Sequence, residues 1–244
     1  MNGVVQIANL GSFGRFGNQL FQYAAARGYA RKIGARLETP PWVGEYLFKG
    51  INAARITSVM PTLPLDTIPQ NGETNINLHG YFQHSQAFEL YTLADLVEWF
   101  TFKDHVKEHL ARYEGVGVVA HLRRGDYLHY PDAFCTIHKS AYETAIAENG
   151  YDVSKVEWVC EENPRDVGLL NIPWLADFAV LLNAQVLFRS NSTFSWWAAL
   201  LWNHYKVYSP VVEGKFGQWS DVKFIEGNWP RCTDQPSVHN YHIK

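Results

Sequence analysis

Short apolar runs alternate with segments of helical periodicity along most of this chain. In the first half, the pattern predicts strands at 4–10, 37–39 and 77–83 and helices at about 18–33 and 91–112. The first helix is indicated by apolar residues that recur at helical spacing: Leu20, Phe21, Ala24, Ala25 and Gly28. The segment 42–75 is broken by prolines and is expected to be irregular, apart from one short helix.

The second half continues the alternation more regularly. A continuous apolar run at 117–120 is typical of a buried strand in a parallel sheet. The elements predicted after it are helices at 138–148, 174–184 and 194–202 and strands at 153–159, 186–188 and 207–209. This order predicts an α/β fold with a parallel, doubly wound sheet, followed by a mostly irregular segment from residue 211.

The length of 244 residues suits one large domain or two small ones. Gly115 and Gly117 precede the central strand, and we place a lobe boundary near them. The expected division is a first lobe at 1–112, a second lobe at 113–230 and a tail at 231–244.

A cluster of polar residues follows the central strand directly: His121, Arg123, Arg124 and Asp126. Open α/β sheets bind their ligands beyond the carboxyl ends of their strands. Arginine carries a fixed charge and a planar fork that matches a phosphate group. We therefore expect a phosphate-bearing ligand at Arg123 and Arg124.

Two further segments have the composition of an anion site. The hydroxyls of Ser192, Thr193 and Ser195 lie where the helix at 194–202 begins, and helix starts attract anions. Simple capping of that helix is the alternative explanation. The glycine-rich segment 11–19 between the first strand and helix either approaches a ligand or makes a plain turn.

Charge and composition exclude some classes of function. The formal net charge of −3 gives no support for nucleic acid as the main partner. Three widely spaced cysteines fit neither a disulfide framework nor a zinc site and suggest a reducing compartment. The start of the chain does not have the pattern of a signal peptide, and no apolar run is long enough for a membrane span. We therefore expect a cytoplasmic protein.

Three segments together resemble the signatures of the α-1,2-fucosyltransferase family, glycosyltransferase family 11. They read GRFGNQ at 14–19, HLRRGDY at 121–127 and SNSTFSWW at 190–197, in the family order, and GYFQ at 80–83 also resembles a family segment. The wider α-1,2/α-1,6/protein O-fucosyltransferase superfamily is similar. The resemblance implies a GT-B fold, which has two Rossmann-like lobes with parallel sheets and a cleft between them. It makes the first lobe, 1–112, the acceptor side and the second lobe, 113–230, the GDP-sugar-binding side.

The resemblance also implies a reaction. It implies transfer of fucose from GDP-fucose to a galactoside-type glycan, with α-1,2 linkage, inversion at the anomeric carbon and no metal or other cofactor. The chain also has no Asp-x-Asp motif of the kind that holds manganese in other glycosyltransferases. The expected partners are a GDP-sugar and a glycan acceptor, and the oligomeric state is left open.

The residue roles implied by the resemblance are as follows. Arg123 would hold the β-phosphate, with His121 lining the same pocket and Arg124 beside it. The diphosphate would lie on Ser192, Thr193, Phe194 and Ser195, and Asp177 would read the guanine edge. In the first lobe, Arg15, Gly17 and Asn18 would lie near the fucose or the β-phosphate.

Some assignments stay open at this level. The candidate bases are Asp126, His121 and the acids near Glu161, although Asp126 can instead be an ion-pair partner that orients an arginine. The Ser-Asp-Asp motif of the family is replaced by Cys160-Glu161-Glu162, and both glutamates can be solvated loop acids. A transferase of the same fold with another nucleotide sugar, or a GDP-sugar-binding protein without catalysis, remains an alternative.

Overall fold

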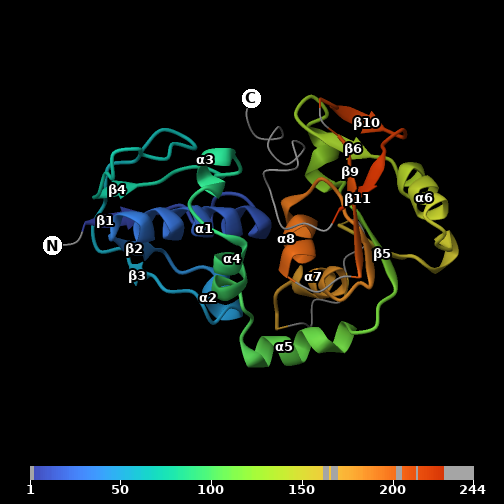
Figure 1. Ribbon diagram of the computed structural model, residues 1–244, viewed down its shortest axis with the longest axis horizontal. Helices are drawn as coiled ribbons and strands as arrows, with labels where there is room; N and C mark the ends of the chain where they lie inside the picture. The colour runs from blue at the N-terminus through green and yellow to red at the C-terminus, as the bar shows by residue number, and fades with distance from the viewer. Residues whose placement is uncertain (1–2, 162–164, 166–169, 202–204, 213, 228–244) are drawn as a thin grey trace. The chain divides into compact units, whose positions relative to one another are not determined.

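The fold is described from a computed structural model, which covers residues 3–161, 165, 170–201, 205–212 and 214–227 (Figure 1). The chain divides into two compact units, Met1–Lys103 and Asp104–Lys244. The division lies before the expected boundary at residue 112. The reason is that helix α5 (Asp104–Leu110) joins the second unit, where Asn183 Nδ2 donates to the Leu110 carbonyl at 3.1 Å.

The first unit contains a parallel four-stranded sheet. Its strand order is β3-β2-β1-β4, and the strands are β1 (Val4–Gln6), β2 (Arg36–Thr39), β3 (Ala54–Arg55) and β4 (Ile76–Asn77). The glycine-rich segment leads from β1 into α1 (Phe16–Ile33), which ends at the left-handed residue Gly34. The strand-loop-helix order predicted for this segment is confirmed.

The prediction of a single helix at 91–112 is wrong, because two separate helices occupy this range. After α2 (Val43–Leu47) and α3 (Ser85–Phe88), the chain forms α4 (Leu93–Trp99), α5 and the 3-10 turn Ala111–Tyr113. Between α4 and α5, Phe102 makes an isolated antiparallel bridge with Phe48, and this long-range pairing interrupts the helix.

The strand predicted at 77–83 is also shorter than expected. β4 ends at Asn77, and beyond it the amides of Tyr81 and Phe82 donate to Asp66 Oδ1 at 2.6 and 2.7 Å. Phe82 itself is left-handed, with φ 54°. A carboxylate that captures two successive amides stops the ladder and turns the chain, so residues 78–83 form a loop.

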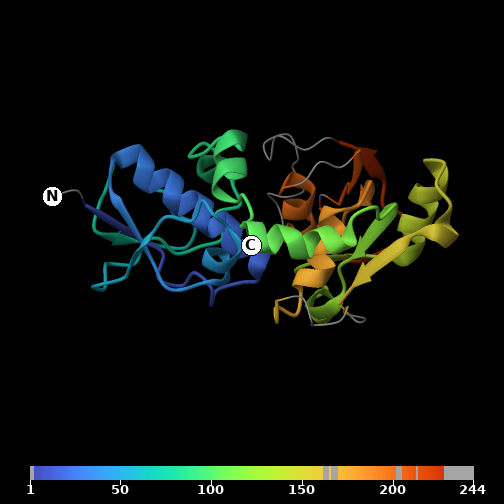
Figure 2. The ribbon, with the colours of Figure 1, turned by 90° about the horizontal axis from the view of Figure 1, so that it is seen from below.

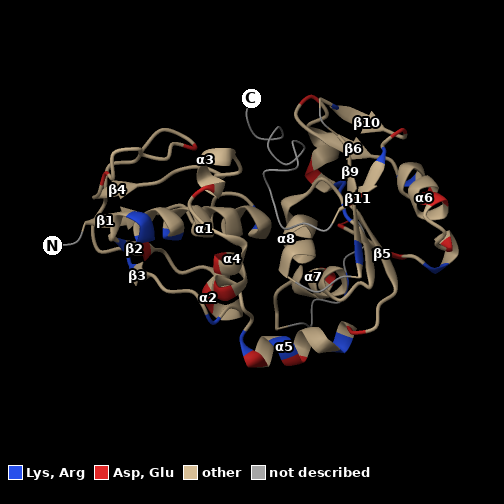
Figure 3. Ribbon diagram, viewed as in Figure 1, with Lys and Arg blue, Asp and Glu red and all other residues tan. Residues whose placement is uncertain are grey.

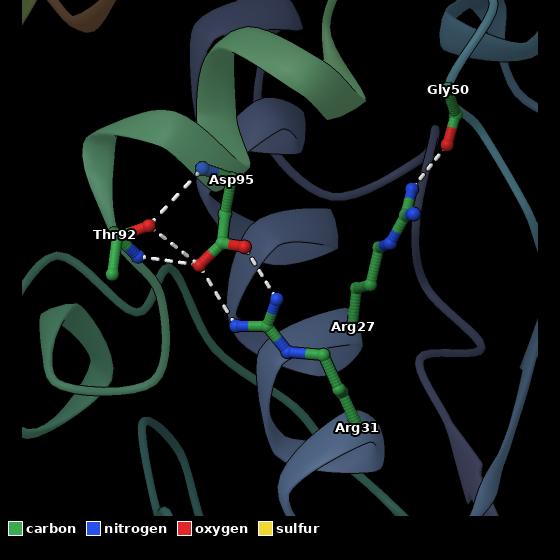
Figure 4. Close-up of polar contacts among 5 residues, drawn as sticks. All are labelled: Arg27, Arg31, Gly50, Thr92 and Asp95. Carbon is green, nitrogen blue, oxygen red and sulfur yellow. Dashed lines mark hydrogen bonds and ion pairs between the residues drawn. The ribbon is translucent and has the colours of Figure 1, made fainter.

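Side-chain contacts tie α4 to α1 (Figure 4). Thr92 and Asp95 form a capping box, in which the Asp95 amide donates to Thr92 Oγ1 at 3.2 Å and Asp95 Oδ2 accepts from the Thr92 amide at 2.7 Å. Arg31 on α1 pairs with the same carboxylate, and Arg27 on α1 donates to the Gly50 carbonyl. The Arg31 hydrogen bonds hold the pKa of Asp95 well below its usual range.

Replacement of this carboxylate is expected to weaken the first unit. Asp95→Ala removes the capping box and the Arg31 pair, and should lower the free energy of unfolding by about 1–2 kcal/mol. Because the Asp95 pKa is depressed by folding, this contribution is present above about pH 4 and is lost as pH falls below it. Urea unfolding at pH 7 measures the effect, and Asp132→Ala, which changes an exposed aspartate, is the control. Equal stability of the two variants contradicts the prediction.

The second unit contains a five-stranded sheet of order β11-β9-β8-β5-β7. Strands β5 (Val118–Leu122), β7 (Glu157–Cys160), β8 (Val186–Phe188) and β9 (Lys206–Pro210) are parallel, and β11 (Phe224–Glu226) is antiparallel to β9. Helix α6 (Lys139–Glu148) covers one face, and α7 (Leu175–Leu182) and α8 (Thr193–Leu201) cover the other (Figures 1 and 2). The predicted parallel, doubly wound sheet is confirmed.

Burial along β5 follows this arrangement. Ala120 and Leu122 lie in the core cluster that contains Tyr142 and Ile146 of α6. His121, between them, points to the opposite face, where its ring contacts Phe194 of α8. The strand is thus buried on both sides, in agreement with its continuous apolar run.

Several short elements of the second unit were not predicted. They are β6 (Cys135–Ile137), its parallel partner β10 (Gly217–Trp219), and β11. Each has three residues, too few for a periodic pattern. The strand predicted at 153–159 begins only at Glu157, because Val153–Lys155 forms a 3-10 turn that Asp152 caps.

Other sequence predictions can be compared with the described residues. Cys135 is buried and Cys160 is half-buried, and Cys232 lies outside the described residues. Acidic and basic residues are interspersed on both units (Figure 3). Among the helices of the described ranges, none combines the length and the apolar character that crossing a membrane requires.

Candidate functional site

Three neighbouring parallel strands of the second unit carry the predicted site residues to one edge. β5 lies between β8 and β7, with Ala120 opposite Phe188 and Leu122 opposite Cys160. Since parallel strands end at the same edge, Arg123 after β5, Glu161 after β7 and the serine-rich turn 190–195 after β8 all lie there. The sequence placed these segments far apart, and the sheet brings them together.

His121 joins the central strand to the serine-rich turn. Its Nδ1 lies 2.9 Å from Ser190 Oγ, which in turn lies 3.2 Å from Ser195 Oγ. Burial lowers the pKa of His121 to about 3, and the charge of Arg123 acts in the same direction. The imidazole is therefore neutral at pH 7. It supports the turn by hydrogen bonding and is a poor general base, although the sequence offered it as one.

Ser192 caps helix α8. Its Oγ accepts from the Phe194 amide at 3.2 Å, and its carbonyl accepts from the Trp196 amide at 3.1 Å. Helix capping, which the sequence offered as the alternative to anion binding, is therefore confirmed for Ser192. Capping does not remove the anion site, since a capping hydroxyl keeps its own proton for donation and Thr193, half-buried, starts the same helix.

Arg189 was not predicted as part of this site. Its side chain is buried beneath the turn, where Nε donates to Ser209 Oγ at 2.8 Å and Nη1 donates to the Ser190 carbonyl at 2.9 Å. It fixes the backbone from which the turn begins. Arg189 directly follows the apolar strand β8, just as Arg123 follows β5, and this position in the sequence is the signal that could have identified it.

Arg123 is held by two carboxylates. Its side chain is 8% exposed and forms ion pairs with Asp126 and with Glu161, while its guanidinium lies 4.6 Å from the centre of the Tyr127 ring. Gly125, with φ 32°, leaves room for this arrangement, because a Cβ there would collide with the Glu161 carboxylate.

These pairs bear on two alternatives from the sequence. Asp126 forms an ion pair with Arg123, which supports its interpretation as an orienting partner, and its role as a base stays a prediction. The interpretation of Glu161 as a solvated loop acid is wrong, since it reaches Arg123 from the neighbouring strand. A phosphate bound here would compete with these two carboxylates for the positive charge of Arg123.

Arg124 lies beside this cluster. It is partly buried and precedes the 3-10 turn Gly125–His129. Its fixed charge, together with that of Arg123, balances the charges of Asp126 and Glu161 at this edge. The four charges at this edge therefore compensate one another within the protein.

Two residues that the resemblance assigns to the nucleotide sugar, Asp177 and Phe194, contact other protein side chains. Asp177 on α7 is 8% exposed and accepts from Arg165 Nη1 at 2.8 Å, so its carboxylate already has a cationic partner. The ring of Phe194 packs against Phe178 and Trp174, with centroid distances of 4.9 and 6.0 Å. The Phe194 ring is therefore a packing group, and its backbone amide already donates to Ser192 Oγ.

The remaining candidates belong to the first unit. Arg15 is exposed and immediately precedes α1, and Gly17 is buried in the first turn of that helix. Asn18 Oδ1 accepts from Gln83 Nε2 at 3.1 Å. The segments 14–19 and 80–83, which the family resemblance singled out separately, therefore meet at the carboxyl edge of this sheet.

No grouping of three or more His, Cys, Asp or Glu side chains suited to a metal ion occurs in the part of the chain that the structure describes. The groups that face the edge of the second sheet are guanidinium, hydroxyl and carboxylate.

Comparisons with known proteins connect this geometry to a fold. No protein-family model matches the chain, and no curated protein matches its sequence. Fucosyltransferase NodZ from Bradyrhizobium has a TM-score of 0.56 at 12% identity, over 93% of this chain and 99% of that one. POFUT1 in complex with GDP has a TM-score of 0.55 at 11% identity, over 90% of this chain and 98% of that one. NodZ α-1,6-fucosyltransferase soaked with GDP-fucose has a TM-score of 0.52 at 13% identity, over 93% of this chain and 99% of that one.

These three structures are of fucosyltransferases with GT-B-like folds. At identities this low the likeness shows the fold: a mixed α/β architecture with parallel sheets, as predicted.

Proposed function

We propose that this chain is an inverting, metal-independent glycosyltransferase that moves fucose from GDP-fucose to a hydroxyl of a galactoside-type glycan, with α-1,2 linkage. One observation carries the proposal. Arg123 and the turn 190–195 follow adjacent parallel strands, joined through the His121–Ser190 hydrogen bond, in a fold similar to that of fucosyltransferases. The α-1,2 linkage rests on the sequence resemblance alone.

The proposed chemistry follows from the charges at this edge. The acceptor oxygen attacks the anomeric carbon from the face opposite GDP, and the bond from that carbon to the β-phosphate oxygen breaks. GDP leaves with the electron pair, and the acceptor proton passes to a base. Arg123, Arg124 and the first amides of α8 would stabilise the developing charge on the diphosphate in place of a metal. Asp126 and Glu161 would orient Arg123.

A donor comparison tests the reaction. The full chain is incubated with lactose and with GDP-fucose, GDP-mannose or UDP-galactose, and the released nucleotide is measured. We expect release with GDP-fucose, dependent on lactose, and an α-1,2-linked product by NMR. A preference for UDP-galactose contradicts the donor assignment. Tight GDP binding without transfer supports a non-catalytic GDP-sugar-binding protein instead.

Removal of metal tests the source of charge stabilisation. Transfer in excess EDTA is expected to proceed at the rate seen without it, because fixed guanidinium and amide groups act on the diphosphate. The rates are compared on the same preparation, with added Mn²⁺ as a third arm. Loss of activity in EDTA that Mn²⁺ restores contradicts the proposed mechanism.

A further inference from the structure

Three rings form a stack at the carboxyl edge of the sheet in the first unit. Phe13 lies against Tyr81, with ring centroids 4.5 Å apart and planes 20° apart, and against His79 at 5.0 Å. Phe13 follows β1, whereas His79 and Tyr81 follow β4, the adjacent parallel strand. All three side chains are half-buried, so the stack reaches the surface.

Neutral polar groups lie beside the stack. Asn9 Nδ2 lies 2.9 Å from His79 Nδ1, an arrangement that leaves the proton of a neutral imidazole on Nε2. Asn18 and Gln83 hydrogen-bond to each other behind Tyr81, whose neighbour Gly14 has no room for a Cβ beside that ring. Aromatic faces with a few amide and imidazole groups form a lining that suits an uncharged polar ligand.

The backbone that carries the stack is held in a costly conformation. Asp66 and Phe82 are both left-handed, with φ 56° and 54°, and the Asp66 carboxylate accepts from the amides of Tyr81 and Phe82. A bulky residue such as Phe82 seldom takes this conformation without support, and such residues cluster where a ligand needs a fixed surface. A Cβ at Gly80 would collide with the same carboxylate. Asp66 therefore fixes the backbone that carries the Tyr81 ring.

We propose that this aromatic stack, Phe13, His79 and Tyr81, binds a sugar ring of the glycan acceptor. The C–H face of the sugar packs on the rings, and its hydroxyls bond to Asn9 and His79. The inference rests on the proposed function, and it names residues that would contact the acceptor in the lobe that the resemblance places on the acceptor side. The arginine- and serine-lined edge of the second unit suits an anion, whereas the stack and Asn9 include no arginine, lysine or carboxylate.

Binding of lactose to the full chain tests the inference. Loss of a stacked ring typically costs enough to weaken binding roughly tenfold, and we expect this change in the lactose Kd for Tyr81→Ala, measured by ligand-observed NMR. Tyr81→Phe keeps the ring and is expected to bind as wild type does. The matched control is Tyr46→Ala, which removes a tyrosine on α2 that is 45% exposed. Titration with GDP and a thermal melt show that the donor site and the fold are intact.

The outcomes separate this inference from the proposed function. Should Tyr81→Ala fail to fold, Asn9→Ala and His79→Gln test the hydroxyl contacts with the rings in place, and each is expected to weaken lactose binding several-fold. Wild-type lactose affinity in these folded variants, or no lactose binding by the wild type, overturns the inference. Lactose binding that depends on Tyr81, without turnover of GDP-fucose, supports the stack and contradicts the proposed function.

Discussion

Arg123→Ala is expected to lower the rate of fucosyl transfer by on the order of 10²–10³. The guanidinium is placed to meet charge that develops on the leaving diphosphate, and alanine supplies no donor there. Arg123→Lys keeps a charge but not the planar fork, so we expect it to recover only part of the rate. The rates are measured as GDP release under saturating GDP-fucose and lactose.

The substitution also leaves two carboxylates without their shared cation. With Arg123 present, the side chains of Asp126 and Glu161 are 40% and 28% exposed, so water can solvate them once the cation is removed. The double variant Arg123→Ala/Glu161→Gln removes one of these two negative charges and so tests whether their repulsion affects folding. Arg55→Ala is the matched control, because Arg55 also pairs with a carboxylate but lies exposed on β3. If folded Arg123→Ala retains activity within a few-fold of wild type, the assignment of this edge is wrong.

His121→Asn is expected to remove a large part of the pH dependence of stability. In the unfolded chain the imidazole titrates near pH 6.5, whereas in the folded chain its pKa is about 3 because it is buried and near Arg123. Below about pH 6.5 only the unfolded state binds the proton. Stability is therefore lost at about 1.4 kcal/mol per pH unit as pH falls from about 6.5 toward 3.

Urea unfolding at pH 7 and pH 5 measures this slope. The wild type should lose about 2 kcal/mol more than His121→Asn between these two conditions. His138→Asn is the control, since His138 is exposed and caps α6, a position that asparagine also serves. Equal losses in wild type and His121→Asn contradict the description of His121 as a buried neutral residue.

The sequence predicts well where local pattern and tertiary structure agree. The apolar run of β5 ends in Arg123 and that of β8 in Arg189 and Ser190, so an edge lined with guanidinium and hydroxyl groups follows once the sheet is taken as parallel. Trp196 and Trp197, which lie in the helix predicted at 194–202, are both buried.

The features that the sequence does not predict depend on contacts between residues that are far apart in the chain. The partner of Arg123 is set by the register of β5 on β7, which places Leu122 opposite Cys160 and so brings Glu161 within reach. The bridge between Phe48 and Phe102 likewise breaks a helix whose local pattern is continuous. These contacts join residues far apart in the chain, and composition near either member carries no sign of them.

The central claim is that Arg123 meets the terminal phosphate of a nucleoside diphosphate. Calorimetric titration of wild type and Arg123→Ala with GDP and with GMP tests it most directly, since the two ligands differ by that phosphate alone. We predict that the wild type prefers GDP by roughly tenfold or more and that Arg123→Ala binds the two ligands about equally. A variant that keeps the wild-type preference contradicts the claim.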